Sequence, residues 1–321
     1  MMKTHNQNRR DSERGGHMAN VIAVIWDFDR TLVDGYMQDP LFARYNVNAE
    51  QFWEEVNALP EHYRKTQGVE VNKDTIYLNR FIHEAQPGGK FEGLNNAILR
   101  ESGSELNFYL GVPEIFDSTR SVIGSNKSFA ERGIRVEHYI VSTGMAEVIR
   151  GSAVSDHVDH IWGCELIETR NASGNPVIGE LGYTIDNTSK TRALFEINKG
   201  VPVEEGIDVN ARVPKNLRRV RFENMIYIAD GPSDVPAFSV VKHYGGSTFA
   251  VYPKGNKKAF AQVEQLREDG RIDMYAEADY SAGTTANMWI THKVTEIAQR
   301  IVSEEKQRLE AAVSAAPKHL T

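Results

Sequence analysis

The chain has 321 residues, of which 37 are basic and 44 acidic, so its formal net charge is −7, and 40% of the residues are apolar. This composition is ordinary for a globular protein, and the length predicts two domains or one large domain with an insertion. The longest unbroken apolar run, Val21 to Trp26, is far shorter than the roughly 20 residues of a membrane helix, so we expect no membrane span. The single cysteine, Cys164, excludes an internal disulfide framework and a multi-cysteine zinc site. One free thiol fits a reducing compartment, so we expect a cytoplasmic protein, and the acidic balance disfavours non-specific binding to nucleic acid.

The first eighteen residues are polar and contain no apolar stretch that could act as a signal peptide. We interpret residues 1–18 as a disordered leader, and a basic targeting arm is the alternative. The fold is therefore predicted from residue 19 onwards.

Short apolar segments rich in β-branched residues predict strands that are buried on both faces of a parallel sheet. The first is Val21 to Trp26, and we expect others at 136–141, 161–167, 225–229 and 248–252. Helices are expected between them, over 113–132 and from about 189 to 197, and a last helix over 291–312. Strands that alternate with helices predict an α/β fold with a Rossmann-like parallel sheet and right-handed crossovers.

Residues 36 to 108 interrupt this alternation, because they contain no clear buried strand. Apolar side chains recur there at helical spacing in 52–59, 76–82 and 94–98, which predicts a small helical core. We therefore expect a helical domain inserted after the first strand. The predicted organisation is a leader at 1–18, an α/β core at 19–34 and 109–300, the helical insertion at 35–108, and a C-terminal helix and tail at 301–321.

Carboxylates follow two of the predicted strands. Asp27 and Asp29 come directly after the first strand, and the two-residue period of a strand projects both to one side. Asp230 and Asp234 follow the strand at 225–229. Open α/β sheets bind ligands at this edge, and carboxylates gathered there repel one another unless one is protonated or a cation intervenes. For the first pair alone, a local turn after the strand is an equal alternative.

Two further polar segments lie between these aspartates in the chain. Ser142-Thr143-Gly144 follows the strand at 136–141, where a hydroxyl and free backbone N–H groups could hold phosphate oxygens. Lys190 opens a later helix. Ser142 alone is a weak signal and Lys190 alone is typical of a solvated surface lysine, but with the aspartates they form an ordered set.

This set resembles the four sequence motifs of the haloacid dehalogenase superfamily. The first motif, Asp-x-Asp-x-Thr, stands as Asp27-Phe28-Asp29-Arg30-Thr31, and the other three match Ser142, Lys190, and Asp230 with Asp234. The resemblance covers residues 19 to about 289, and the insertion directly after the first motif looks like a C1-type cap.

Within the superfamily, the chain looks most like the phosphoserine phosphatase branch. It differs from that branch at Tyr36, where an acidic residue is usual, and at Ala229 and Ser233 beside the fourth motif. The resemblance therefore implies the chemistry of the branch without implying phosphoserine as the substrate.

The resemblance implies hydrolysis of a small phosphorylated metabolite through an aspartyl-phosphate. Asp27 would attack phosphorus, and Asp29 would protonate the leaving oxygen and then activate water. Ser142, Thr143 and Lys190 would hold the phosphate oxygens as charge develops.

The resemblance also implies Mg²⁺ as the cofactor, because this hard cation prefers oxygen ligands. The implied ligands are the side chains of Asp27, Asp230 and Asp234 and the backbone carbonyl of Asp29. Asp234 would bind the cation more weakly and would orient Lys190.

Two other functions stay open: a phosphomutase that returns the phosphoryl group to a bound sugar, and a non-catalytic ligand-binding protein on the same fold. Asp29 favours a phosphatase or mutase over a dehalogenase, because the dehalogenases of the superfamily lack an acidic residue at this position. Nucleic acid and membranes are not expected partners, and the oligomeric state is not predicted.

Other polar groups have a functional interpretation and a plainer one. His157 and His160 could suggest a metal pair, but we interpret them as the exposed end of a helix. The basic stretch at 212–221 could bind a polyanion, but we interpret it as a solvated loop. Four basic residues of the insertion could contact an anionic substrate, although a surface position is the plainer interpretation: Arg44, Arg64, Lys65 and Arg80.

Overall fold

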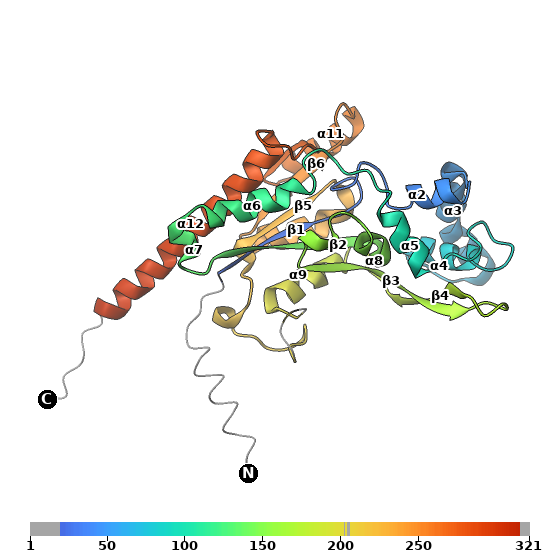
Figure 1. The fold of residues 1–321 in the computed structure, drawn as a ribbon, viewed down its shortest axis with the longest axis horizontal. Helices are drawn as coiled ribbons and strands as arrows, with labels where there is room; N and C mark the ends of the chain where they lie inside the picture. The colour runs from blue at the N-terminus through green and yellow to red at the C-terminus, as the bar shows by residue number, and fades with distance from the viewer. Residues whose placement is uncertain (1–19, 202, 204–205, 315–321) are drawn as a thin grey trace, which may run out of the picture.

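The computed structural model describes residues 20–201, 203 and 206–314, so the expected leader at 1–18 and the end of the tail lie outside the described residues. The strands form a seven-stranded sheet with the order β4-β3-β2-β1-β5-β6-β7 (Figure 1). Neighbouring strands are parallel except for the antiparallel pair of β3 and β4. The strands are β1 Val21–Trp26, β2 Arg135–Met145, β3 His160–Arg170, β4 Pro176–Tyr183, β5 Met225–Ala229, β6 Ser247–Tyr252 and β7 Met274–Glu277.

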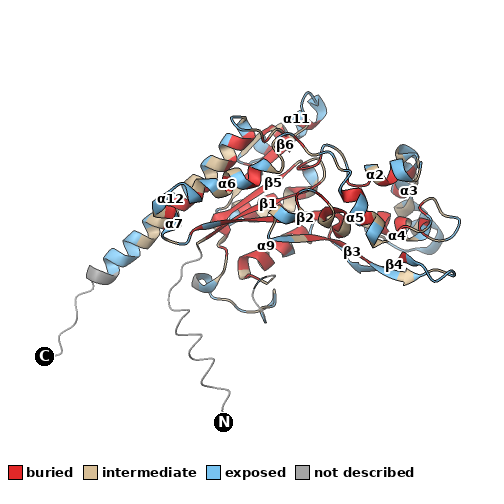
Figure 2. Cartoon of the chain, in the orientation of Figure 1, coloured by how far each residue is buried: buried red, intermediate tan, exposed pale blue. Residues whose placement is uncertain are grey.

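Helices cover both faces of this sheet, which confirms the predicted α/β fold. α6 and α12 contact each other, and α12 also packs on β1, while α9 and α10 pack together on the opposite face, as right-handed crossovers require. Figure 2 shows buried residues concentrated in the strands and on the inner sides of these helices, whereas the C-terminal part of α12 is exposed. The helices of the α/β part are α6 Glu114–Gly124, α7 Lys127–Ala130, α8 Ala146–Arg150, α9 Lys190–Lys199, α10 Val235–His243, α11 Lys257–Glu268 and α12 Thr285–Ser314.

The predicted elements differ from the structure mainly at their ends. β2 continues to Met145, so Ser142 lies inside the strand rather than after it, next to a register shift between Val141 and Met145. The helix expected over 113–132 is split into α6 and α7, because the Asn126 side chain accepts a hydrogen bond from the Ser128 N–H and starts a new helix. The last helix is longer than predicted and runs without a break across residue 301. Among the described residues, no helix combines the length and apolar character needed to cross a membrane.

The segment after β1 forms helices, as its apolar spacing predicts. They gather beyond one end of the sheet (Figure 1): α2 Asp39–Arg44, α3 Ala49–Gln67, α4 Ile76–Glu84 and α5 Asn96–Gly103. Their core is aromatic: Phe52, Phe81 and Phe91 are fully buried, with ring centroids 4.7–5.5 Å apart. The two linkers lie side by side, since the Asp34 N–H donates to the Asn107 carbonyl at 2.9 Å. The boundaries at 35 and 108 stay a prediction.

The β3–β4 hairpin forms hydrogen bonds with this helical domain. The Ile178 N–H of β4 donates to the Leu94 carbonyl at 2.9 Å, and the Asn96 side chain donates to the Leu166 carbonyl of β3 at 3.0 Å. Gln86 adds a bond from its side chain to the Ile178 carbonyl. The helical domain therefore rests on the sheet through backbone contacts as well as through its linkers.

Candidate active site

The centre of the sheet brings three chain segments together. β1 lies between β2 and β5, and Trp26 at its end pairs with Ile140 of one neighbour and Ile228 of the other. The next residue, Asp27, donates from its backbone N–H to the Ile228 carbonyl at 2.9 Å. Asp27 therefore lies between the ends of two neighbouring strands, where Ser142 and Asp230 are found, in the type of crevice where open α/β sheets bind ligands.

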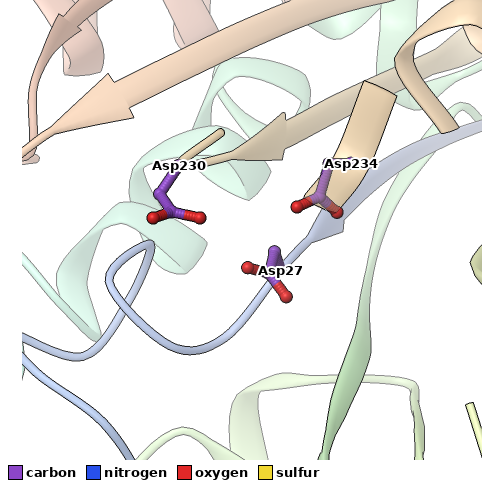
Figure 3. Close-up of side chains that lie close together, drawn as sticks. All are labelled: Asp27, Asp230 and Asp234. Atoms are coloured by element: carbon purple, nitrogen blue, oxygen red, sulfur yellow. The ribbon is translucent and has the colours of Figure 1, made fainter. Parts of the chain in front are cut away.

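Three carboxylates meet at this place. Asp27, Asp230 and Asp234 each offer an oxygen within 4.8 Å of the others (Figure 3). Burial raises the pKa of Asp27 to about 6, with Lys190 opposing the shift and Asp234 adding to it. Burial and then the charges of Asp27 and Asp234 raise the pKa of Asp230 to about 7. The cluster is thus short of positive charge.

Lys190 lies inside this cluster rather than on the surface. As the first residue of α9 it is 1% exposed, and its Nζ donates to Asp27 Oδ1 at 2.8 Å and to Asp234 Oδ1 at 2.7 Å. Burial lowers the pKa of Lys190, but the two carboxylates outweigh it and the pKa lies above its ordinary value. Asp234 also accepts hydrogen bonds from Tyr227 Oη and Ser233 Oγ. The predicted contact between Asp234 and Lys190 is present.

Asp29 is held from the segment that enters the helical domain. Its Oδ1 accepts a hydrogen bond from the Met37 N–H at 2.8 Å. Burial, reinforced by the charge of Asp27, raises the pKa of Asp29 well above its ordinary value of 3.8. A carboxyl group with a raised pKa releases its proton less readily, which suits the role of a general acid.

Met37 also connects Asp29 to the end of β2. Its Sδ accepts a hydrogen bond from the Met145 N–H at 3.0 Å, and its methyl group lies where a Cβ at position 144 would be, so a side chain there would have to displace Met37. Met37 was not predicted as a site residue, because a methionine in a polar linker shows no local pattern that indicates contacts with Asp29 and Met145.

Ser142 and Thr143 lie within β2 rather than after it, and their backbone groups have more hydrogen-bond partners than expected. Ser142 is buried, and its Oγ accepts a hydrogen bond from the Gly144 N–H at 3.0 Å. The expectation of free N–H groups is therefore wrong for Gly144, since the bulge in β2 turns this group onto the hydroxyl. The Ser142 hydroxyl can still donate a hydrogen bond, because the contact with Gly144 uses it only as an acceptor. The Thr143 carbonyl accepts a hydrogen bond from Tyr77 Oη of α4 at 2.8 Å, which ties the helical domain to this segment.

The basic stretch at 212–221 is not simply a solvated loop. Arg219 forms an ion pair with Glu137 of β2, and Arg221 pairs with Glu223 and with Glu304 of α12. The interpretation as a solvated loop is thus wrong for these two residues, whose charges are matched by buried or half-buried carboxylates.

The remaining candidates do not join the site. Among the described residues, the carboxylate cluster is the one group of three or more ligand-type side chains close enough to hold a metal, and it contains neither His157 nor His160. The four basic residues of the helical domain that were considered as substrate contacts are paired with acids: Arg44 with Glu101, Arg64 and Lys65 with Glu61, and Arg80 with Glu55 and Glu84.

The carboxylate cluster fits a divalent cation. Its donors are oxygen atoms, which Mg²⁺ prefers, and the pKa values of Asp27 and Asp230 are raised first by burial and then by repulsion between the carboxylates, which a cation would offset. The Asp29 side chain lies outside the cluster, so its expected contribution through the backbone carbonyl stays a prediction.

Comparisons with known proteins give one sequence relative and several similar structures. No protein-family model matches the chain. An "uncharacterized protein" of Borreliella burgdorferi is 36% identical over 288 residues, which are 86% of this chain and 97% of that protein. Among solved structures, a HAD family hydrolase of Salmonella enterica serovar Typhi has a TM-score of 0.49 at 13% identity, covering 86% of this chain and 76% of that one. A phosphoserine phosphatase in its apo form (TM-score 0.45, 15% identity, 79% and 92% covered) and cytosolic 5'-nucleotidase IIIB bound to cytidine (0.45, 13%, 94% and 95%) are also similar.

Proposed function

We propose a hydrolytic function for this chain. The chain belongs to the same family as the Borreliella burgdorferi protein and, by its motifs and topology, to the haloacid dehalogenase superfamily. The function is hydrolysis of a small-molecule phosphomonoester through a phosphorylated Asp27. One observation carries this proposal: Asp27, a neighbouring protonatable Asp29 and a buried Lys190 meet at the ligand-binding edge of the sheet.

The first half-reaction uses Asp27 and Asp29. Lys190 Nζ donates to Asp27 Oδ1 at 2.8 Å, and Thr31 Oγ1 donates to Oδ2 over 3.4 Å. In our proposal Oδ2, the oxygen that does not bind the lysine, attacks phosphorus. Attack forms a bond between this oxygen and phosphorus and breaks the ester P–O bond. Asp29 gives its proton to the departing oxygen, which leaves as an alcohol.

The second half-reaction restores both aspartates. Asp29, now a carboxylate, takes a proton from a water molecule, and the water oxygen attacks phosphorus. The bond to Asp27 breaks and inorganic phosphate is the second product. Lys190 and the Ser142 hydroxyl hold the non-bridging oxygens as their charge increases.

A divalent cation, Mg²⁺ in our proposal, would be held by Asp27, Asp230 and Asp234. When bound, it offsets the negative charge that a carboxylate and a phosphate dianion bring together. Arg30 and Lys190 do not replace it, because the carboxylates of the cluster already outnumber them.

The decisive experiment measures phosphate release from a panel of phosphomonoesters with and without Mg²⁺. We expect release by the unmodified chain with Mg²⁺, none by Asp27→Asn, and full release by Asp117→Asn, which removes an exposed carboxylate of α6. No release from any ester would contradict the proposal. Transfer of the phosphoryl group to an added sugar phosphate, without free phosphate, would identify a mutase instead.

A further inference from the structure

We propose that Arg30 binds an anionic group on the leaving alcohol of the substrate. The protein would then prefer phosphorylated carboxylic acids or bisphosphates to phosphate esters of neutral or cationic alcohols. This inference rests on the proposed function and specifies its substrate class.

The backbone of Arg30 adopts a conformation that favours glycine. Its φ is +56°, and among the described residues the only other non-glycine residue with a positive φ is Asn46, a type that tolerates this region. For arginine the conformation costs about 1–2 kcal/mol. Such conformations persist where the surrounding structure holds them and gather at functional sites. Here the Arg30 N–H donates to the Gly35 carbonyl at 3.1 Å, which closes the turn.

This conformation directs the guanidinium to a place between an aromatic ring and the carboxylate cluster. Arg30 lies 6.0 Å from the ring centroid of Tyr36 and donates to its hydroxyl over 3.4 Å. Its Nε is 3.6 Å from Asp230 Oδ2, beyond hydrogen-bond distance. Within the described part of the chain, Tyr36 is its only hydrogen-bond acceptor, although a guanidinium has five N–H donors. The group is positioned, and most of its donors remain available.

Arg30 and Tyr36 lie on either side of the general acid along the chain. Arg30 follows Asp29 directly, and Tyr36 precedes Met37, whose N–H holds the Asp29 carboxyl group. The leaving oxygen must come within about 2.6–3.2 Å of Asp29 to receive its proton. In this proposal the next atoms of the leaving alcohol pass beside Arg30 and Tyr36. The side chain of Arg30 is 29% exposed, and residue Tyr36 is 45% exposed.

Five other basic side chains considered for the site are already paired with carboxylates. Lys190 is buried and bound to Asp27 and Asp234, and the four basic residues of the helical domain considered above pair with glutamates. Arg30 is thus the cation placed to meet the leaving alcohol. Arginine binds carboxylate and phosphate groups through paired N–H donors, whereas an ammonium group would be repelled.

The test compares three two-carbon esters that differ in charge: phosphoglycolate (anionic), ethyl phosphate (neutral) and phosphoethanolamine (cationic). For the unmodified chain we expect kcat/KM to fall in that order, by about tenfold or more overall, since each factor of ten needs only about 1.4 kcal/mol. Ethylene glycol bisphosphate, as a fourth ester, distinguishes a second phosphate from a carboxylate. Arg30→Gly should raise KM for phosphoglycolate about tenfold and leave ethyl phosphate unchanged.

Two further variants sharpen the result. Glycine suits a φ of +56°, so Arg30→Gly should fold and melt at or above the temperature of the unmodified chain. Arg30→Lys keeps the charge and should retain part of the preference. Arg44→Gln, which removes a basic residue paired with Glu101, is the matched control and should leave kcat/KM unchanged for all three esters.

Different failures point to different errors. An equal loss on all three esters in Arg30→Gly would mean that Arg30 positions Asp230, and no charge preference in the unmodified chain would mean that it does not meet the leaving group; either result overturns the inference. If the unmodified chain releases no phosphate at all, the proposed function fails. Thermal shifts with 3-phosphonopropionate and propylphosphonate then still test Arg30, because stronger stabilisation by the carboxylated compound should disappear in Arg30→Gly, and equal shifts would overturn the inference.

Discussion

The Nζ of Lys190 lies 2.8 Å from Oδ1 of Asp27, although the two residues are 163 positions apart in the sequence. This contact joins the start of α9 to the end of β1, and both residues are buried. Lys190 binds one of the two Asp27 carboxylate oxygens, and in our proposal the other oxygen attacks phosphorus. The same ion pair thus contributes to the fold and orients the proposed nucleophile.

Removing the Lys190 charge should destabilise the protein strongly. Lys190→Met leaves Asp27 and Asp234 buried without their shared cation, and breaking such a pair costs about 3–5 kcal/mol. Urea unfolding at pH 7.5 without added cation measures the loss. Lys65→Met, which removes an exposed partner of Glu61, should stay within about 0.5 kcal/mol. A loss below about 1 kcal/mol for Lys190→Met would contradict the role of this pair.

Without divalent cations, the free energy of unfolding should fall as the pH rises from about 4 to about 7. Burial raises the pKa of Asp27 to about 6 and that of Asp230 to about 7, from an ordinary value of 3.8. In this interval the folded state keeps protons that the unfolded state has released, so the contribution is complete below the unfolded pKa and lost above the folded one. Urea titrations at pH 4.5, 6 and 7.5 would show the decline. Asp230→Asn should flatten it, and an unchanged slope in that variant would assign the effect to other groups.

Addition of Mg²⁺ should stabilise the protein more at pH 7.5 than at pH 5. At the lower pH the raised pKa values keep Asp27 and Asp230 partly protonated, and protons compete with the cation for the same oxygens. At a concentration of 100 times the dissociation constant, the gain at pH 7.5 is about 2.7 kcal/mol. Melting curves with and without Mg²⁺ at both pH values measure it. A gain of equal size at both would place the cation elsewhere.

The sequence was most informative where chemistry and a buried strand coincide. Val21–Trp26 is continuously apolar because it is buried on both faces, so the position of Asp27 and Asp29 at its end followed from local pattern. The expectation that Ser142 and Asp230 lie near these aspartates followed from the rule that parallel strands end at one edge. Lys190, at the start of a helix, was assigned only through the resemblance to the four motifs. The four-residue strand β7 has a weaker sequence pattern and was not predicted.

Contacts between distant segments could not be predicted in the same way. Met37, Tyr77 and Tyr227 reach the site from a linker, a helix of the inserted domain and the middle of a strand, and each looks locally like an ordinary buried side chain. The left-handed conformation of Arg30 has no signature in a residue type that usually avoids it. Partners of this kind depend on packing, which a single sequence does not display.

The pairing of Arg219 with Glu137 gives a test of the basic stretch. The two residues are 82 positions apart, and Glu137 is only 5% exposed, so Arg219→Met leaves a nearly buried carboxylate with less compensation. Because Arg135 and Tyr139 still contact Glu137, we expect a loss of about 2 kcal/mol, below the roughly 3–5 kcal/mol of a fully broken buried pair. Arg212→Met, an exposed change in the same stretch, should leave urea unfolding unaffected. Equal effects of the two variants would restore the interpretation as a solvated loop.

The hydrogen bond from Tyr77 to the Thr143 carbonyl should couple the inserted helical domain to the proposed phosphate site at Ser142 and Thr143. Tyr77→Phe removes the donor and leaves a half-buried carbonyl with the weaker Cys164 Sγ contact at 3.3 Å, which should cost about 0.5–1.5 kcal/mol in urea unfolding. Since Thr143 adjoins Ser142, the variant should also lower kcat/KM for phosphomonoesters by about threefold to tenfold, the kinetic equivalent of about 0.7–1.4 kcal/mol. Tyr63→Phe, on α3 of the same domain, is the matched control and should change neither quantity. If Tyr77→Phe lowered stability but left kcat/KM intact, the bond would hold the domain in place without influencing the phosphate site.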